Sequence, residues 1–108
     1  MKKVLTSVLA IAVLATALPA AAAGRIDEQE RRIEQRIDRG MRSGEITRRE
    51  GFILREQLRD IERLEARYRR SGGLNGWERA DLERRLDVLS ARVFGARHDC
   101  DRRGRDRC

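Results

Sequence analysis

The sequence predicts an all-α domain of three antiparallel helices that follows a signal peptide. The first observation is an internal repeat at an offset of 28 residues, in which residues 43–50 return as residues 71–78. The second is a set of apolar residues at steps of 4, 3 and 4, the heptad spacing of helices that pack along a narrow seam. The third is a helix-start signal in each copy of the repeat. One helix–turn unit is therefore used twice, and we expect helices at about 25–42, 47–70 and 76–94.

Residues 1–23 have the three-part organisation of a secretory signal peptide. Two lysines come near the start, an uncharged apolar run continues to Leu18, and four alanines follow Pro19. The apolar run is shorter than the roughly 20 residues that span a bilayer, which argues against an uncleaved membrane anchor. We expect a bacterial protein that is periplasmic or secreted. Cleavage after Ala22 and cleavage after Ala23 both stay open.

The processed chain is small and carries charges of both signs. Without residues 1–23 it has 85 residues (108 − 23), with 23 arginines against 18 acids, a formal net charge of +5 (23 − 18). This length allows one small domain. The signs alternate along the helices, as on a solvated face with ion pairs between residues three or four apart. Since nucleic-acid recognition needs a patch of one sign, we expect no nucleic-acid partner.

Each predicted helix has a seam of apolar residues that must be buried against the other two helices. The seam is interrupted twice by an acid: Glu30 stands where the repeat would place a leucine, and Glu65 stands where the other helices have Ile37 and Val93. The apolar seam residues are Ile26, Ile33 and Ile37, then Leu54, Leu58, Ile61 and Tyr68, then Leu82, Leu86, Leu89 and Val93.

The two corners between helices carry matching signals. Gly44 and Gly72 can take the left-handed conformation that ends a helix. In each corner a capping residue follows, with a glutamate three positions later. The capping side chain is expected to accept a hydrogen bond from the backbone N–H of the glutamate, and the glutamate side chain to accept one from the backbone N–H of the capping residue. The cap pairs are Thr47 with Glu50 and Asn75 with Glu78.

The corners also have a glycine and a glutamate at the sixth and twelfth places of a calcium-binding EF-hand loop. That loop needs oxygen ligands at its first, third and fifth places. Arginine at the first place repels a cation, so the sequence predicts no calcium site and no cofactor. The residues at these places are Arg39, Met41 and Ser43 in one corner and Arg67, Arg69 and Ser71 in the other.

Residues 95–108 have no heptad pattern and are predicted to form a flexible tail. They hold both cysteines, Cys100 and Cys108, and an exported chain with two cysteines most simply forms one disulfide. Pairing within one chain and pairing between two chains both stay open. A zinc site would need four nitrogen or sulfur ligands, so we expect no metal site. Five arginines against three aspartates predict a weak contact of the tail with an anionic envelope surface.

Catalysis has little support in this sequence. The single histidine, His98, lies in the predicted tail, and no nucleophile–base set can be assembled around it. Three short helices also leave no obvious pocket for a substrate. The sequence therefore predicts that the protein is not an enzyme and has no small-molecule substrate.

Several large apolar residues fall off the seams. Phe52, Ile53, Trp77 and Phe94 would be partly exposed in a lone three-helix bundle. Exposed aromatic residues of this kind mark contact surfaces, and a domain of this size is only marginally stable alone. We predict a homodimer, or a complex with another protein, that uses Phe52, Ile53 and Trp77.

Taken whole, the chain after residue 23 resembles a group of small exported Arg-rich helical proteins of proteobacteria, which carry an SGxLTxxE corner twice. This resemblance implies export and fold but no activity. Residues 46–50 are also similar to the LTxxQ motif of exported stress proteins, although both copies have Glu in place of Gln. The predicted function is a non-enzymatic periplasmic helical protein that binds a protein or the envelope surface. The alternative, implied by the second resemblance, is an LTxxQ-like periplasmic chaperone or metal-stress protein.

Overall fold

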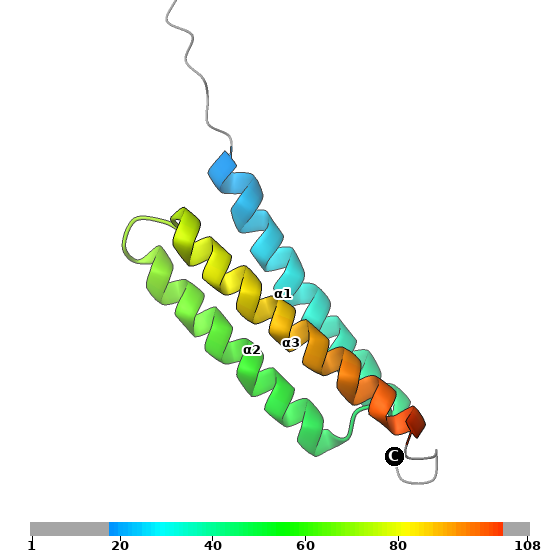
Figure 1. Ribbon diagram of the computed structural model, residues 1–108. Coiled ribbons are helices and arrows are strands. Elements are labelled where there is room, and N and C mark those ends of the chain that lie inside the picture. The colour runs from blue at the N-terminus through cyan, green and yellow to red at the C-terminus, as the bar shows by residue number, and fades with distance from the viewer. Residues whose placement is uncertain (1–17, 103–108) are drawn as a thin grey trace, which may run out of the picture.

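The computed structural model describes the backbone of residues 18–102 and the side chains of residues 24–99. This part of the chain folds into three helices, α1 (Leu18–Ser43), α2 (Arg48–Arg69) and α3 (Gly76–Arg102). Each helix packs against the other two. As Figure 1 shows, α2 runs opposite to α1, and α3 returns in the direction of α1. The predicted all-α fold of three packed helices is therefore confirmed.

The core consists of the seam residues that the heptad spacing selected, except Tyr68, together with Ile46 from the first corner. Ile46 precedes the cap of α2, the position at which an apolar residue anchors the entry of a helix. Met41, Leu64, Tyr68, Leu74 and Ala96 are partly buried against this core. The fully buried large side chains are Ile26, Ile33, Ile37, Ile46, Leu82, Leu86 and Val93.

Glycines close the C-terminal ends of α1 and α2. Gly44 has a φ of +79° and Gly72 has a φ of +104°, and Gly73 beside it has a φ of +105°. A side chain at these backbone angles would clash with the following carbonyl, which glycine avoids. The predicted helix ends at both corners are therefore confirmed.

Both predicted capping boxes are present. At the start of α2 the backbone N–H of Glu50 donates to the Thr47 hydroxyl at 3.1 Å, and the Thr47 N–H donates to the Glu50 carboxylate at 3.0 Å. At the start of α3 the Glu78 N–H donates to Asn75 Oδ1 at 2.8 Å, and the Asn75 N–H donates to Glu78 at 3.4 Å. These bonds satisfy backbone donors that have no partner inside the helix.

Thr47→Ala should lower the free energy of unfolding by about 1 kcal/mol, because the Glu50 N–H loses its acceptor. Urea denaturation followed by circular dichroism measures this loss. Thr47→Ser keeps the hydroxyl and is the matched control, which should stay close to the parent protein. An alanine variant as stable as the parent would show that the cap contributes nothing.

Helix α3 continues to Arg102, eight residues past the predicted end at 94, so the described part of the predicted tail is helical. Gly95 in a helix interior costs about 1 kcal/mol relative to alanine. Two contacts offset this cost: Ala96 packs on the core, and Arg97 Nε donates to the Glu45 carboxylate at 2.5 Å. The bond from Arg97 also holds the pKa of Glu45 below its ordinary value. The start of α3 was predictable from local signals, but its length depends on these tertiary contacts.

Two predictions fall mainly outside the described residues. The proposed signal peptide covers residues 1–23, of which the structure describes only the helical backbone from Leu18. The side chains of Cys100 and Cys108 are not described, so the disulfide stays a prediction. Among the residues that were described, no helix is long and apolar enough to cross a membrane.

Candidate functional site

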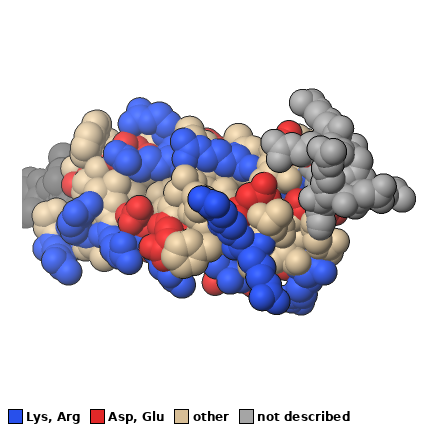
Figure 2. Space-filling view, turned by 90° about the horizontal axis from the view of Figure 1, so that it is seen from below, with Lys and Arg blue, Asp and Glu red and all other residues tan. Residues whose placement is uncertain are grey.

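The surface carries mixed charges, and Figure 2 shows blue and red side chains interspersed over one face of the bundle. Many acids pair with an arginine three or four residues away on the same helix, as the charge pattern predicted. Exposed pairs of this kind contribute about 0–1 kcal/mol each, so they mainly keep the surface solvated. The exposed pairs are Arg31–Glu28, Arg32–Glu28, Arg59–Glu56 and Arg63–Asp60. In Arg69–Glu65, Arg84–Asp81 and Arg85–Asp81 the arginine is partly exposed and the acid is buried.

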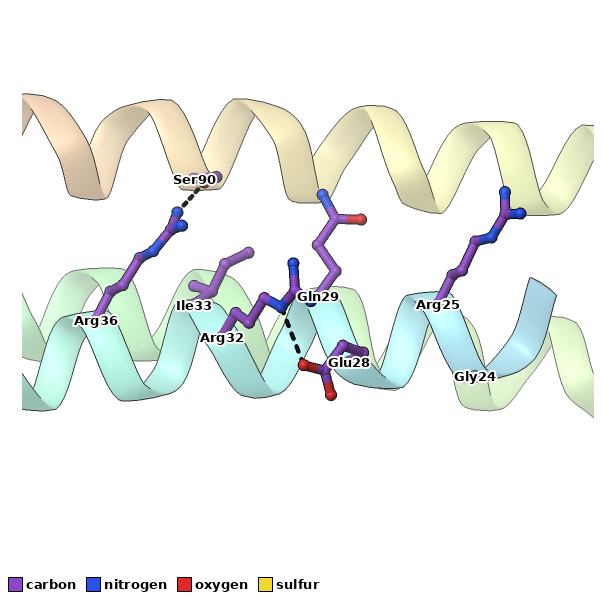
Figure 3. A pocket seen from close by; sticks show the side chains of 8 residues that line it. All are labelled: Gly24, Arg25, Glu28, Gln29, Arg32, Ile33, Arg36 and Ser90. Atoms are coloured by element: carbon purple, nitrogen blue, oxygen red, sulfur yellow. Dashed lines mark hydrogen bonds and ion pairs between the residues drawn. The ribbon is translucent and has the colours of Figure 1, made fainter. Parts of the chain in front are cut away.

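A groove of about 460 Å³ lies between α1 and α3 and is lined by three arginines of α1. Figure 3 shows Arg25 and Arg36 directed toward α3, with Arg36 Nη1 donating to Ser90 Oγ at 3.2 Å. Arg32 Nε donates to Glu28 at 3.0 Å along the same helix. The α1–α3 groove is therefore positively charged, and the hydrogen bond from Arg36 to Ser90 crosses it.

A second groove runs between α2 and α3. It consists of two hollows of about 440 and 340 Å³ that share Gln57 and Arg92, so the hollows are continuous. Ile53 of α2 and Val88 of α3 line it and are 48% and 49% exposed. We call this surface the α2–α3 groove. Its apolar lining also includes Leu54, Ile61, Leu89 and Ala96.

The three residues predicted as a contact surface are exposed, but the structure does not bring them together. Phe52 and Ile53 lie near the start of α2, whereas Trp77 lies at the opposite end of the bundle. There Trp77 packs edge-on against Tyr68, with ring centroids 5.8 Å apart. Tyr68 and Phe52 are about 24 Å apart along the helix axis at 1.5 Å per residue. Of the three, only Ile53 lines the α2–α3 groove.

Val88 is the exposed apolar residue that sequence reasoning missed. It directly precedes the seam residue Leu89 and was hidden by the heptad pattern. Val88 and Trp77 are 11 residues apart, which is about three helical turns, so both lie on one face of α3. This spacing is the sequence pattern from which the exposure of Val88 could have been predicted. Phe94 lies about 120° around α3 from Val88 and does not line the groove. Its ring stacks on His98 at a centroid distance of 3.9 Å.

The two acidic seam residues meet inside the bundle. Glu30 of α1 and Glu65 of α2, together with Asp27, each place a carboxylate oxygen within 4.8 Å of the others. Glu65 is only 7% exposed. Arg69 Nη2 lies 2.5 Å from Glu65 Oε1 and 3.6 Å from Asp27 Oδ1. We call these three acids the seam carboxylates.

The environment of the seam carboxylates favours the protonated form of Glu30. Burial, followed by the hydrogen bond and the negative charge of Glu65, raises the pKa of Glu30 to about 9. Burial and the charges of Glu34 and Glu65 also raise the pKa of Glu62 on the same side of α2. At neutral pH the proton on Glu30 and the guanidinium of Arg69 offset two of the three negative charges that the cluster would otherwise hold. A metal ion would have to displace both, so the arrangement favours a structural role for these acids.

Asp81 is the other buried acid in the described part of the chain, and its bonds are made within the bundle. The Tyr68 hydroxyl donates to it at 2.8 Å, and Arg84 and Arg85 donate at 2.8 and 3.0 Å. The bond from Tyr68, then those from Arg85 and Arg84, hold the pKa of Asp81 below its ordinary value. This carboxylate joins α2 to α3. His98, the single histidine of the chain, uses Nδ1 to bond the Phe94 carbonyl at 2.8 Å.

Calcium should not stabilise the protein. The glutamates at the twelfth places of the two corners, Glu50 and Glu78, accept hydrogen bonds from the capped helix starts. We expect the melting temperature with ~5 mM calcium to match that with EDTA. Magnesium at the same concentration controls for ionic strength. A stabilisation of several degrees specific to calcium would show that the corners bind the ion.

No protein-family model, curated protein or solved structure matches this chain. The geometry of the grooves and of the seam carboxylates is therefore the basis for assigning a function.

Proposed function

We propose that this is a non-enzymatic protein of the bacterial periplasm that acts by binding another protein through the α2–α3 groove. The observation that carries the proposal is the half exposure of Ile53 and Val88 along a continuous groove with an apolar lining. Covering such side chains is worth roughly 25 cal/mol per Å² of apolar surface removed from water. Export is supported by the signal-peptide pattern of residues 1–23.

A binding role fits the described side chains better than catalysis does. The buried acids Asp81 and Glu65 are held by hydrogen bonds and ion pairs within the bundle. Both grooves are shallow surface features between helices and do not enclose a ligand, as substrate pockets usually do. The proposal therefore includes no catalytic residue and no small-molecule substrate.

Capture from an envelope extract tests the proposal. The processed protein is immobilised beside two variants, Val88→Arg in the groove and Phe94→Ser as the matched control. Both positions are exposed and apolar on α3, but only Val88 lines the groove. We expect the arginine variant to lose its bound protein and the serine variant to keep it. Equal capture by both variants would exclude the groove as the binding surface.

The α1–α3 groove supports an envelope-surface contact as part of the same function. Arg25, Arg32 and Arg36 line it, with Glu28 as the one acid in the lining. Arginine pairs bidentately with phosphate, so an anionic lipid surface is the chemistry that this groove fits. Co-sedimentation with vesicles that contain anionic lipid should decrease for Arg25→Glu with Arg36→Glu. Binding that both substitutions leave unaltered would exclude this groove.

The chaperone-like alternative is favoured by one feature, the exposure of aromatic side chains on separate parts of the surface. Phe52, Trp77 and Phe94 are all more than 60% exposed. Surfaces that hold unfolded clients need accessible apolar groups of this kind. Suppression of client aggregation at a near-stoichiometric ratio would favour this role over recognition of one partner.

A further inference from the structure

The outer face of α1 carries charge of one sign, although the signs alternate along its sequence. At about 100° per residue, four of the five acids of α1 fall on the flank that is turned toward α2. Each of the four meets a residue of α2: Asp27 and Glu30 meet Glu65, Glu34 acts on Glu62, and Asp38 pairs with Arg55. The arginines of α1 fall outside this flank and are all exposed. They are Arg25, Arg31, Arg32, Arg36, Arg39 and Arg42, which we call the α1 outer face.

One acid remains among these arginines. Glu28 accepts a hydrogen bond from Arg32 at 3.0 Å and also pairs with Arg31. Six arginines against one glutamate give the α1 outer face a net charge of +5 (6 − 1). Such a face is what a polyanion recognises, and it arises because the helix sorts alternating charges onto different sides.

The acids that border the α1 outer face are occupied within the bundle. On the side of α3, the Asp87 carboxylate accepts a hydrogen bond from Gln29 at 2.7 Å. On the side of α2, Asp38 pairs with Arg55. Arg25, by contrast, is directed toward α3 and has no acid partner among the described residues (Figure 3).

We propose that the α1 outer face lies along an anionic lipid surface, with the α2–α3 groove held on the opposite side of the bundle and directed away from that surface. This inference rests on the envelope-surface contact of the proposed function and names the face and orientation of that contact. Each helix packs against the other two, so the groove between α2 and α3 lies across the bundle from α1. A protein bound in the groove would therefore be held at the lipid surface without competing for the arginines.

The spacing of the charges favours lipid over a single small anion. Arg25, Arg32 and Arg39 follow one another at steps of seven residues, about 10 Å along the helix. One phosphate cannot bridge that distance, whereas a lipid surface presents many separate phosphates, each of which an arginine fork can bind. The predicted export also makes lipid the available polyanion, rather than nucleic acid.

Co-sedimentation with vesicles of equal parts phosphatidylglycerol and phosphatidylcholine tests the α1 outer face. The face variant, Arg31→Glu with Arg39→Glu, reverses two charges that do not line the α1–α3 groove. An arginine near an anionic surface contributes roughly a factor of five to binding, so the face variant should bind at least about twentyfold more weakly.

The control variant is Arg63→Glu with Arg67→Glu, which makes the same change in net charge at exposed positions of α2. At ~0.1 M salt, charges farther than about 10 Å from the lipid are largely screened, so the control variant should lose less than about threefold. Circular dichroism of both variants should match the parent protein, because the four arginines are exposed.

Tryptophan quenching tests the orientation. Trp77 is the single tryptophan and packs against Tyr68 of α2, away from the α1 outer face. Vesicles that carry a nitroxide on the lipid headgroup should therefore leave the emission of the parent protein nearly unaltered. Gln35 lies four residues from both Arg31 and Arg39, in the middle of the face. In the probe variant, Gln35→Trp with Trp77→Phe, the same vesicles should quench at least about half of the emission.

Four results would overturn the inference. They are equal loss of binding in the face and control variants, unaltered binding of the face variant, equal quenching in the parent protein and the probe variant, and binding to polyglutamate without binding to the vesicles. The last result would assign the face to an acidic protein. Stronger binding to neutral vesicles of phosphatidylcholine alone would also contradict it, because the arginines need anionic lipid.

The experiments separate this failure from that of the proposed function. Vesicle binding that falls for Arg25→Glu with Arg36→Glu but not for the face variant would keep the envelope contact in the α1–α3 groove and exclude the α1 outer face. A parent protein that ignores the vesicles would exclude both lipid contacts. Protein capture through Val88 is measured without lipid, so it decides the binding role of the α2–α3 groove independently.

Discussion

Leu58→Asp combined with Leu86→Asp should leave the protein unfolded. Both leucines are seam residues, one on α2 and one on α3, and they are only 4% and 0% exposed. Each aspartate would be buried without a partner, and each change also removes a core side chain that is worth about 2–5 kcal/mol. The combined loss is comparable to the whole stability of a small domain, about 5–15 kcal/mol.

Circular dichroism measures this effect as loss of the helical signal and of a cooperative thermal transition. Phe52→Asp with Phe94→Asp is the matched control, because it places the same two charges on exposed positions of the same two helices. The control should keep both the helical signal and the transition. A cooperative transition in the leucine variant would mean that the seam does not hold the bundle together.

The parent protein should become less stable as the pH rises, and Glu30→Gln should be free of this loss. The pKa of Glu30 is about 9 in the folded chain, against an ordinary value of 4.5. Between these values the folded chain holds a proton that the unfolded chain has released, so the free energy of unfolding falls as the pH rises. The stabilising contribution is complete below about pH 4.5 and is lost by about pH 9.

Urea denaturation at about pH 6 and about pH 8.5 measures the slope. Glutamine keeps the shape of the protonated acid and cannot ionise, so its curve should be flatter and lie above that of the parent at the higher pH. The pKa of Glu62 is also raised, and this residue is the same in both proteins, so the difference between the two curves reports on Glu30. Asp27, Glu65 and Arg69 face the same cluster and are unaltered in this comparison.

Two further variants make this test specific. Asp60→Asn changes an exposed acid of α2 that pairs with Arg63 and does not act on this cluster, and it should leave the slope nearly unaltered. Glu30→Leu restores an apolar seam residue and should stabilise the protein by about 1–3 kcal/mol at neutral pH. Parallel pH curves for the parent and for Glu30→Gln would show that Glu30 ionises in the folded chain as it does in water.

The sequence alone determined the helices, their seams and their corners. Leu58, Leu86 and Val93 are buried because a repeat of 4 and 3 residues returns to the same face of a helix. Thr47 caps α2 and Gly44 ends α1 through bonds and backbone angles that involve only nearby residues. These features follow rules that operate within one or two helical turns, so the sequence is sufficient to predict them.

Only the tertiary structure decided how separate helices meet. Glu30 and Glu65 were each recognisable as acids in an apolar seam, but their close approach, which helps to raise the pKa of Glu30, requires that α1 and α2 pack in one register. Tyr68 reaches Asp81 for the same reason. The length of α3 beyond 94 and the open groove beside Val88 also depend on side chains from other helices. Heptad spacing fixes which face of a helix is buried, whereas register and direction set which residues of two faces come into contact.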